Sequence, residues 1–335
     1  MYHAHFRGTH YEAGFRWGSL LLKHQNIILE NIPFEITQER IDYASSCLPI
    51  YDKFYHEIIE EIQGLADGQH CDVRILQAVL FSMYSMPPAC NCSCFAFTTG
   101  QEILLGRNSD FLTEIEKLNM NVIYRLTDGA YSFTGNTTAF VEVEDGVNEY
   151  GLAAGLTSVY PIQHKPGFNA GLLLRYLLEK CKNVSEAISC LHQLPIASAQ
   201  TLTLADISGE IVLVECTPDR VEVTTSLSNT HPFVCDTNAF HLTNMMQYNR
   251  AGIDDWFAET RFQTMMSAFQ NTEKFDLVFA RKLLSGDYGF LCQYDRSTGK
   301  DTVWSVIYDL KHHKIYRSEG NPRRRNFKED TRFCF

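Results

Sequence analysis

The sequence predicts an α+β protein of one domain, in which helices come first and a strand-rich region follows. Before Cys92, apolar residues recur at helical spacing, whereas short strand-like segments dominate from Cys92 onward. No repeat, low-complexity linker or Pro/Gly-rich boundary separates the two parts. A chain of 335 residues, 45% of them hydrophobic, has enough apolar side chains to bury one large core. We therefore expect helices that cover β-sheets around that core.

Three helices are predicted before Cys92. The first spans about residues 11–30 and starts after Gly8-Thr9. The second spans about residues 51–66, where apolar side chains share one face. The third spans about residues 72–85, with Asp72 as its N-terminal cap.

After Cys92 the pattern changes to strands interrupted by two pairs of helices. The strands are expected at residues 94–98, 102–107, 121–126, 140–143, 152–159, 201–205, 211–215 and 221–225. The helices are expected at residues 171–182, 184–191, 259–270 and 275–284. A closing hairpin is expected at residues 302–309 and 314–317.

Composition and charge exclude several classes of protein. The net charge is −11, and Lys and Arg form no long block, which argues against a nucleic-acid or membrane partner. No signal-peptide pattern and no apolar run of membrane-spanning length is visible. The 11 cysteines mostly stand singly in apolar segments, which is typical of a reduced, cytoplasmic protein. No cofactor and no metal is expected, and homo-oligomer formation is left open.

The run Cys90-Asn91-Cys92-Ser93-Cys94 directly precedes a strand-like segment and has three interpretations. Alternate cysteines on a strand point to one face and could bind a metal, but no second ligand pair at zinc-type spacing is present. The cysteines could also be small hydrophobic residues of a buried strand. The third interpretation is that one of them is a nucleophile.

The returning strand favours the nucleophile. After the turn at residues 99–101, the segment 103–111 carries Arg107 and Asp110, which a hairpin would place beside the start of the first strand. A cation near a thiol favours the reactive thiolate, and a carboxylate could hold a freed α-amine. An exposed ion pair at a strand end is the alternative for these two residues.

The order Cys92-Ser93-Cys94, then Gly106-Arg107-Asn108-Ser109-Asp110, resembles the acyl-coenzyme A:6-aminopenicillanic acid acyltransferase (isopenicillin-N acyltransferase-like) family. The choloylglycine (bile-salt) hydrolases are more distantly similar. Further segments follow the family order along most of the chain: Gly8–Gly14, Glu61–Gly68, Asn148–Ala153, Glu215–Pro218, Asp236–Asn238 and Thr302–Asp309. In these acyltransferases the Gly of the second motif follows the nucleophile by fourteen residues, and Gly106 stands in that relation to Cys92. Cys90 or Cys94 would need a shift of two residues.

The resemblance implies the N-terminal nucleophile hydrolase fold, a four-layer αββα sandwich with an N-terminal helical segment. It also implies self-cleavage between Asn91 and Cys92, into pieces 1–91 and 92–335. The freed α-amine, whose reference pKa is about 7.7–8.0, would then serve as the general base. The implied site comprises catalytic Cys92, Asp110, Asn238 and Arg107, and substrate-binding Thr217, Cys94 and Asn108.

Simpler roles exist for some of these residues. Asn238, implied to be an oxyanion-hole donor, could cap a loop, Thr217 could form a turn before Pro218, and Cys94 could be a core residue. The sequence also departs from the family, because relatives carry an Arg shortly before the last strand, where Arg296 or Lys300 stands here.

Two neighbours differ as well. Asn91 replaces the Gly of the fungal acyltransferase, and Ala239 follows Asn238 where His is usual.

The predicted activity is hydrolysis of a linear amide C–N bond, in a small-molecule acyl-amide, through a Cys92 thioester. The alternative is an acyltransferase that moves an acyl group from an amide or thioester to an amine. A non-enzyme alternative is an inactive scaffold that kept the fold. Packing alone does not require Cys92 together with Arg107, Asp110 and Asn238, which argues against the scaffold.

Overall fold

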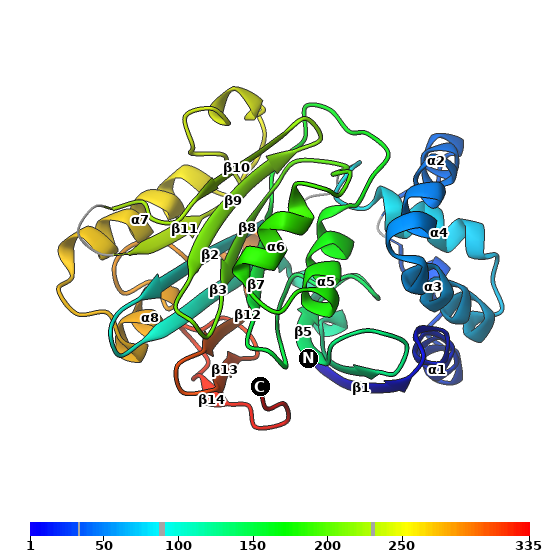
Figure 1. Cartoon of the computed structure of the whole chain (residues 1–335), viewed down its shortest axis with the longest axis horizontal. Coiled ribbons are helices and arrows are strands. Elements are labelled where there is room, and N and C mark those ends of the chain that lie inside the picture. The colour runs from blue at the N-terminus through cyan, green and yellow to red at the C-terminus, as the bar shows by residue number, and fades with distance from the viewer. Residues whose placement is uncertain (33, 87–90, 229–231) are drawn as a thin grey trace.

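The structure, a computed structural model, describes residues 1–32, 34–86, 91–228 and 232–335. In these residues two β-sheets pack face to face between two layers of helices (Figure 1). One sheet has the strand order β1-β4-β5-β6-β7-β8-β9-β10, and the other has the order β11-β2-β3-β12-β13-β14. The predicted αββα sandwich is confirmed.

The helices are α1 (His10–Lys23), α2 (Gln38–Phe54), α3 (His56–Gln69), α4 (Val73–Ser82), α5 (Ala170–Lys180), α6 (Val184–Leu191), α7 (Ala258–Asn271) and α8 (Leu277–Leu284). The strands of the first sheet are β1 (Tyr2–Gly8), β4 (Met120–Leu126), β5 (Phe133–Thr137), β6 (Asp145–Asn148), β7 (Ala153–Ser158), β8 (Gln200–Ala205), β9 (Ile211–Thr217) and β10 (Arg220–Thr224). Those of the second are β2 (Asn91–Thr98), β3 (Ile103–Leu112), β11 (Phe233–Asp236), β12 (Lys300–Asp309), β13 (Lys314–Ser318) and β14 (Lys328–Glu329).

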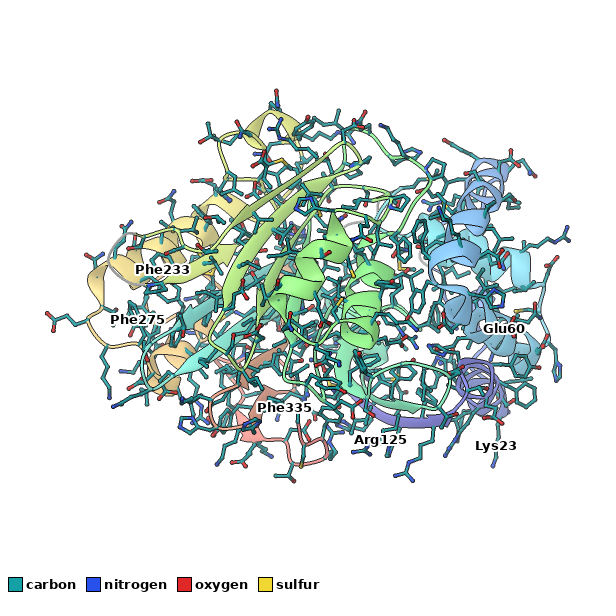
Figure 2. The ribbon with its side chains drawn as sticks, in the orientation of Figure 1. Lys23, Glu60, Arg125, Phe233, Phe275 and Phe335 are labelled. Carbon is teal, nitrogen blue, oxygen red and sulfur yellow. The ribbon has the colours of Figure 1, made fainter. Side chains whose placement is uncertain are left out.

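Three hydrophobic clusters separate the layers. Between the sheets, alternate side chains of β2, β3 and β12 meet those of β4, β7 and β9. On the outer face of the first sheet, α5, α6 and the N-terminal helices form the largest cluster. On the outer face of the second sheet, α7 and α8 pack on the strands, and Figure 2 labels Phe233 and Phe275 on this side. The site residues of β2 and β3 therefore lie in a strand pair covered on both faces.

Two glycine-containing segments of the N-terminal region pack against each other. A Cβ atom at Gly14 of α1 would lie 2.0 Å from the Glu61 carbonyl oxygen, and one at Gly64 of α3 would lie 2.2 Å from the Tyr11 carbonyl oxygen. Only glycine permits such close approach of two helix backbones. This contact explains the presence of Gly14 and Gly64 in the segments Gly8–Gly14 and Glu61–Gly68.

Several predicted boundaries are confirmed. Thr9 and Glu12 form a capping box at the start of α1, and Asp72 caps α4 through the Arg74 N–H. Asn183 caps α6.

Other boundaries are wrong. The helix predicted at 51–66 is two helices, because the chain breaks at Tyr55, whose φ of −151° is not helical. The strand predicted at 140–143 is a turn, and Phe140 has a φ of 57°. The real strands on either side, β5 and β6, contain buried polar residues that hide their alternating pattern.

Helix α2 and the strands β1, β11 and β14 were not predicted. Strands β11 and β14 are short, and β1 is held by parallel pairing to β4, a long-range contact. No helix of the described residues is both long and apolar enough to cross a membrane.

Candidate active site

The β2–β3 hairpin positions the predicted nucleophile. Cys92 lies opposite Ser109, and Cys94 lies opposite Arg107, in an antiparallel ladder. Because side chains alternate along a strand, these four side chains share the face that meets the other sheet. The Arg107 Nη2 atom lies 2.7 Å from the Cys92 Sγ atom. The predicted proximity of a cation and this thiol is present in the structure.

Arg107 is fully buried and is held by the other sheet. Its Nη1 donates to Asp145 at 3.0 Å, its Nη2 lies 3.3 Å from Glu144, and its Nε donates to the Leu156 carbonyl at 2.9 Å. Burial alone would lower the pKa of Arg107, but the Cys92 thiol and the two carboxylates raise that pKa well above its usual value. The guanidinium therefore stays charged, and a fixed cation at this distance stabilises a thiolate.

Asp145 is fixed by the last long strand of the chain. Trp304 Nε1 donates to it at 2.9 Å, and the Tyr308 hydroxyl donates at 2.6 Å. Both side chains come from β12, within the segment Thr302–Asp309 that resembles the family's last strand. This segment supports the site indirectly, because it holds Asp145, which in turn holds Arg107.

Asp110 lies on the opposite face of β3. Its carboxylate accepts hydrogen bonds from the Tyr294 hydroxyl at 2.9 Å and the Thr302 hydroxyl at 2.5 Å, and Arg261 Nη1 lies 3.7 Å away. Burial raises the pKa of Asp110 to about 6, against the opposing effects of Arg261 and the two hydroxyls. Asp110 pairs with Asn91 in the ladder, so it stands beside the peptide bond before Cys92.

Arg261 of α7 is a site residue that was not predicted. Its Nη1 donates to the Cys92 carbonyl oxygen and to Ser93 Oγ, the latter at 3.0 Å, and its Nη2 donates to Asn238 Oδ1 at 2.8 Å. It is fully buried and joins β2, β3 and the segment after β11. A signal existed in the sequence, since Arg261 falls on the apolar face of a predicted helix, with Phe262 and Met265.

Asn238 follows β11 and lies beside the Cys92 backbone. The Cys92 N–H donates to Asn238 Oδ1 at 2.9 Å, and Asn238 Nδ2 donates to the Ser158 carbonyl at 2.8 Å. Together with Arg261 as a second donor to Oδ1, these partners define the orientation of the amide. Its oxygen, and not its NH2 group, therefore faces Cys92 in the intact chain.

The three predicted substrate-binding residues lie in three different environments. Thr217 Oγ1 accepts from Asp219 N at 3.4 Å in the turn between β9 and β10, which is the simpler of its two roles. Asn108 Nδ2 donates to the Leu284 carbonyl at 3.0 Å, on the face of β3 that α8 covers. Cys94 shares the face of Cys92 but is packed in the core.

Close packing and a raised pKa describe the Cys94 thiol. Burial raises the pKa of Cys94 well above the ordinary value, with Asp236 adding to the effect. A Cβ atom at Gly155 would lie 2.6 Å from the Cys94 Sγ atom, which shows how closely this sulfur is packed. Cys90, the third member of the metal interpretation, lies outside the described residues, and Arg107 disfavours a second cation beside Cys92 and Cys94.

The two candidates for the family arginine lie elsewhere. Arg296 is 44% exposed and pairs with Glu116 at 3.1 Å and with Asp301. Lys300 pairs with Asp254 at 2.5 Å. Arg261 is the arginine that the structure brings to the Cys92 backbone.

Comparisons with known proteins agree with this architecture. Residues 97–324, about two thirds of the chain, match the family described as acyl-coenzyme A:6-aminopenicillanic acid acyl-transferase, a match that begins after Cys92. No curated protein is significantly similar in sequence.

Three solved structures share parts of the fold. One is an N-acylethanolamine-hydrolyzing acid amidase ortholog from Caenorhabditis elegans, with 16% identity over 66% of this chain and 93% of that chain and a TM-score of 0.49. The second is a mutant of conjugated bile acid hydrolase from Clostridium perfringens, with 14% identity over 72% of this chain and 97% of that chain and a TM-score of 0.46. The third is penicillin V acylase from Agrobacterium tumefaciens, with 16% identity over 68% of this chain and 82% of that chain and a TM-score of 0.41. At these identities and TM-scores they add no weight to the family match. On the family match, the chain belongs to the acyl-coenzyme A:6-aminopenicillanic acid acyl-transferase family, and it is an enzyme.

Proposed function

We propose that the chain is a cysteine amidohydrolase, which cleaves itself between Asn91 and Cys92 and then attacks linear amide C–N bonds with the Cys92 thiolate. The contact of 2.7 Å between Arg107 Nη2 and Cys92 Sγ carries the proposal. A fully buried cation that is itself held by two carboxylates supplies the charge that a thiolate nucleophile needs. The tight packing of the Cys94 sulfur, and the contact of Arg107 Nη2 with Cys92 Sγ, support Cys92, and not Cys94, as the nucleophile.

In the proposed self-cleavage, Cys92 Sγ attacks the carbonyl carbon of Asn91. The C–N bond between the two residues breaks, a thioester forms, and the nitrogen takes a proton to become the α-amine of Cys92. Water then hydrolyses the thioester, which frees the carboxylate of Asn91 and restores the thiol.

The surroundings of Asn91 support this reaction. Asn91 is 1% exposed, and neither atom of its side-chain amide has a hydrogen-bond partner among the described residues. A buried amide left in this way costs about 1–3 kcal/mol. Hydrolysis would let Asn91 leave the ladder and would relieve that cost.

In the proposed turnover, the freed amine takes the thiol proton while sulfur attacks the carbonyl carbon of the substrate. The amine of the substrate leaves with a proton, and water releases the acyl group from the thioester. Asn238 Oδ1, already bonded to the Cys92 nitrogen, would hold the new amine, and Asp110 would add a nearby negative charge. Arg261 would keep Asn238 and the Cys92 carbonyl in place.

The second candidate is acyl transfer, which the name of the matching family favours. The same thioester would then be attacked by an amine instead of water. Adding a primary amine such as glycine methyl ester during turnover separates the two, because a transferase forms the new amide and a hydrolase forms mainly the free acid.

Intact mass after purification tests the proposal. We expect two associated pieces, residues 1–91 and 92–335, and a single intact chain for Cys92→Ala. An intact wild-type protein that nevertheless hydrolyses amides would contradict the free-amine mechanism. If the wild type is intact and inactive, Asn91→Gly tests whether Asn91 stalls the cleavage, and continued failure to cleave would reject self-processing.

A further inference from the structure

Two cysteines meet where α5 and α6 cover the first sheet (Figure 1). Cys181 directly follows α5, and Cys190 is the second-last residue of α6. Both thiols are free, and their Sγ atoms lie 3.5 Å apart. We propose that Cys181 and Cys190 form a redox-active pair, which a low-molecular-weight disulfide such as glutathione disulfide converts reversibly into an intramolecular disulfide. This modification site lies outside the candidate active site and does not depend on the proposed amide-cleaving function.

The short connection between α5 and α6 brings the two thiols together. The side chain of Asn183 caps α6, so this helix begins three residues after Cys181. Ala187 and Leu191 of α6 are buried against the same hydrophobic cluster as Cys181. Cys190 lies three residues after Ala187, so helical spacing places its side chain at the edge of this buried face.

The separation of the two sulfur atoms is small enough for a disulfide to form by a local movement. A disulfide bond is about 2.05 Å long, so the sulfurs must approach each other by about 1.5 Å. The backbone carbonyl of Cys181 accepts a hydrogen bond from Asn148 Nδ2 at 2.7 Å, which holds the inner cysteine in place. Cys190 is only half-buried, so its side chain can turn toward Cys181 without opening the core.

The two thiols differ in the way that thiol–disulfide exchange requires. Cys190 is accessible to a small oxidant, whereas Cys181 is fully buried. The Cys181 thiol donates to the Cys190 sulfur, and this hydrogen bond lowers the pKa of Cys190 to about 7, against the effects of burial and Glu186. The same hydrogen bond, together with burial, raises the pKa of Cys181. Cys190 is therefore suited to attack first and Cys181 to complete the exchange.

The proposed oxidation takes place in two exchange steps. The Cys190 thiolate attacks one sulfur of glutathione disulfide, whose S–S bond breaks, and one glutathione leaves as a thiolate. The Cys181 thiol then loses its proton to solvent and attacks Cys190 Sγ, which releases the second glutathione as a thiolate. Two protein thiols are oxidised by two electrons, and one glutathione disulfide is reduced to two glutathione molecules.

Two other accessible thiols provide an internal comparison. Cys71 is half-buried, and Cys334 is exposed near the end of the chain. Burial, with Asp72 adding to the effect, raises the pKa of Cys71. Among the residues that the structure describes, neither thiol is hydrogen-bonded to another cysteine. Reaction of either one with glutathione disulfide should therefore stop at a mixed disulfide with glutathione.

The disulfide would fix the C-terminal end of α5. Closing the ten-residue loop 181–190 restricts the unfolded chain, which favours the folded state on the order of 10²-fold. Glu179 lies two residues before Cys181 and contacts His10 Nε2 at 3.0 Å. Oxidation would thus hold the end of the helix that contacts the N-terminal region.

The first test maps the disulfide. Protein is reduced, freed of reductant and treated with excess glutathione disulfide, and the remaining thiols are blocked with iodoacetamide. Cleavage after glutamate gives peptides 180–186 and 187–210, because Glu186 stands between the two cysteines. We expect these peptides to be joined with the loss of two hydrogen atoms, and to separate after treatment with reduced glutathione. Free thiols at both positions, or a glutathione adduct that persists on Cys190, would overturn the proposal.

The second test separates the roles of the two thiols. In Cys181→Ser a glutathione adduct should accumulate on Cys190, because no second thiol displaces it. In Cys190→Ser the buried Cys181 should remain a free thiol in the folded protein. Cys71→Ser is the matched control, since it removes a half-buried thiol elsewhere, and it should form the cross-link as the wild type does. Loss of the cross-link in Cys71→Ser, or no adduct in Cys181→Ser, would contradict the assignment.

Thermal unfolding provides a readout that does not depend on peptide mapping. Glutathione disulfide should raise the melting temperature of the wild type and of Cys71→Ser by a few degrees, since both can close the loop. It should not raise the melting temperature of Cys190→Ser. An equal rise in all three proteins would show that the stabilisation does not come from a disulfide between Cys181 and Cys190.

Discussion

The chain buries two arginines in similar surroundings, and only one of the two contacts a candidate nucleophile. Arg107 lies between the sheets with Glu144, Asp145 and the Cys92 thiol. Arg175 of α5 lies on the outer face of the first sheet. Both side chains are fully buried, and each is held by two carboxylates.

The cluster around Arg175 is satisfied by ordinary ion pairs. Arg175 pairs with Glu61 and with Glu179 at 2.8 Å, and Glu179 also accepts from the Tyr55 hydroxyl at 2.6 Å and contacts His10 Nε2 at 3.0 Å. Burial would lower the pKa of His10, but Glu179 raises it to about 9. His10 is therefore protonated at neutral pH and also pairs with Asp128 at 2.8 Å, so each charged group of the cluster has an oppositely charged partner.

The difference shows what distinguishes a reactive cluster from a structural one. Burial of a charged residue is common to both, and so are strong pKa shifts, which structural ion pairs also produce. What sets Arg107 apart is its contact with a thiol. The Arg175 cluster joins Glu61 and His10, which precede Cys92, to Arg175 and Glu179, which follow it, so it is suited to hold the two predicted pieces together.

The largest expected effect is the loss of the nucleophile. Cys92→Ser keeps the volume nearly constant but replaces the thiolate with a hydroxyl of much higher pKa, so turnover should fall on the order of 10³-fold or more. The melting temperature should change little, apart from any effect of blocked processing. Initial rates and thermal unfolding of the same preparation measure both.

Cys94→Ser is the control for this change. It alters a buried thiol and can cost stability, but the folded protein should still turn over. If Cys94→Ser were inactive and Cys92→Ser active, the nucleophile would be Cys94, two residues further along the chain. If both variants were active, neither cysteine would be the nucleophile, and both would serve only as packing residues of the strand.

Removing Arg175 should lower the stability of the protein but not its rate of turnover, the reverse of the effect expected for Cys92→Ser. Arg175→Met leaves Glu61 and Glu179 buried without their main partner, which should lower the free energy of unfolding by about 3–5 kcal/mol. The rate per folded molecule should stay near wild type. Urea unfolding and activity-corrected kcat provide the measurements.

Arg107→Met is the matched substitution in the other cluster. Here the rate per folded molecule should fall as well, because the thiolate loses its cation. If Arg175→Met and Arg107→Met had the same effect on kcat, the functional distinction between the two clusters would fail.

A smaller loss is expected at Arg261. Arg261→Gln removes the contacts with the Cys92 carbonyl and Asn238, and misplacement of the nucleophile should lower kcat/KM about 10²-fold. Arg296→Gln should be close to wild type, since Arg296 is half-exposed and pairs with Glu116. Equal effects of the two variants would show that Arg261 does not position the site.

The smallest expected effect is a change in how the free energy of unfolding depends on pH when Asp110 is replaced. The pKa of Asp110 is raised from 3.8 to about 6, so between these values the folded chain binds more protons than the unfolded chain. The stability that this group contributes is complete below pH 3.8 and is lost as pH rises through about 6. In Asp110→Asn that component is absent.

The measurement is the difference in unfolding free energy between wild type and Asp110→Asn from about pH 4 to 7. This difference in unfolding free energy should fall by at most about 1.4 kcal/mol for each unit of pH. A difference that does not change with pH would contradict the raised pKa of Asp110. Burial also raises the pKa values of Asp236 and Glu215. Their contributions to the pH dependence are the same in both proteins and cancel in the difference. Activity of Asp110→Asn should be reduced at every pH, because its amide offers the α-amine no charge.

Local pattern was enough to predict the fold class and the hairpin at the site. The alternation around Cys92 and the turn at 99–101 place Arg107 beside the thiol, because register in a tight hairpin follows from a few neighbouring residues. Most of the later helices and strands were predicted for the same reason. The family order of short motifs added Asn238, which lies far along the chain from Cys92.

The remaining parts of the site depend on contacts that no local pattern encodes. Arg261 reaches Cys92 only because α7 packs on the outer face of β2, and Glu144 and Asp145 reach Arg107 only because the two sheets stack. Strand β6, which begins at Asp145, and its neighbour β5 carry buried polar residues, whose favourable partners exist only in the folded chain. The sequence by itself determined the nucleophile candidate, its cation and the layer order. Tertiary packing decided which distant side chains complete the site, because burial of charge is tolerable only where partners from other layers meet it.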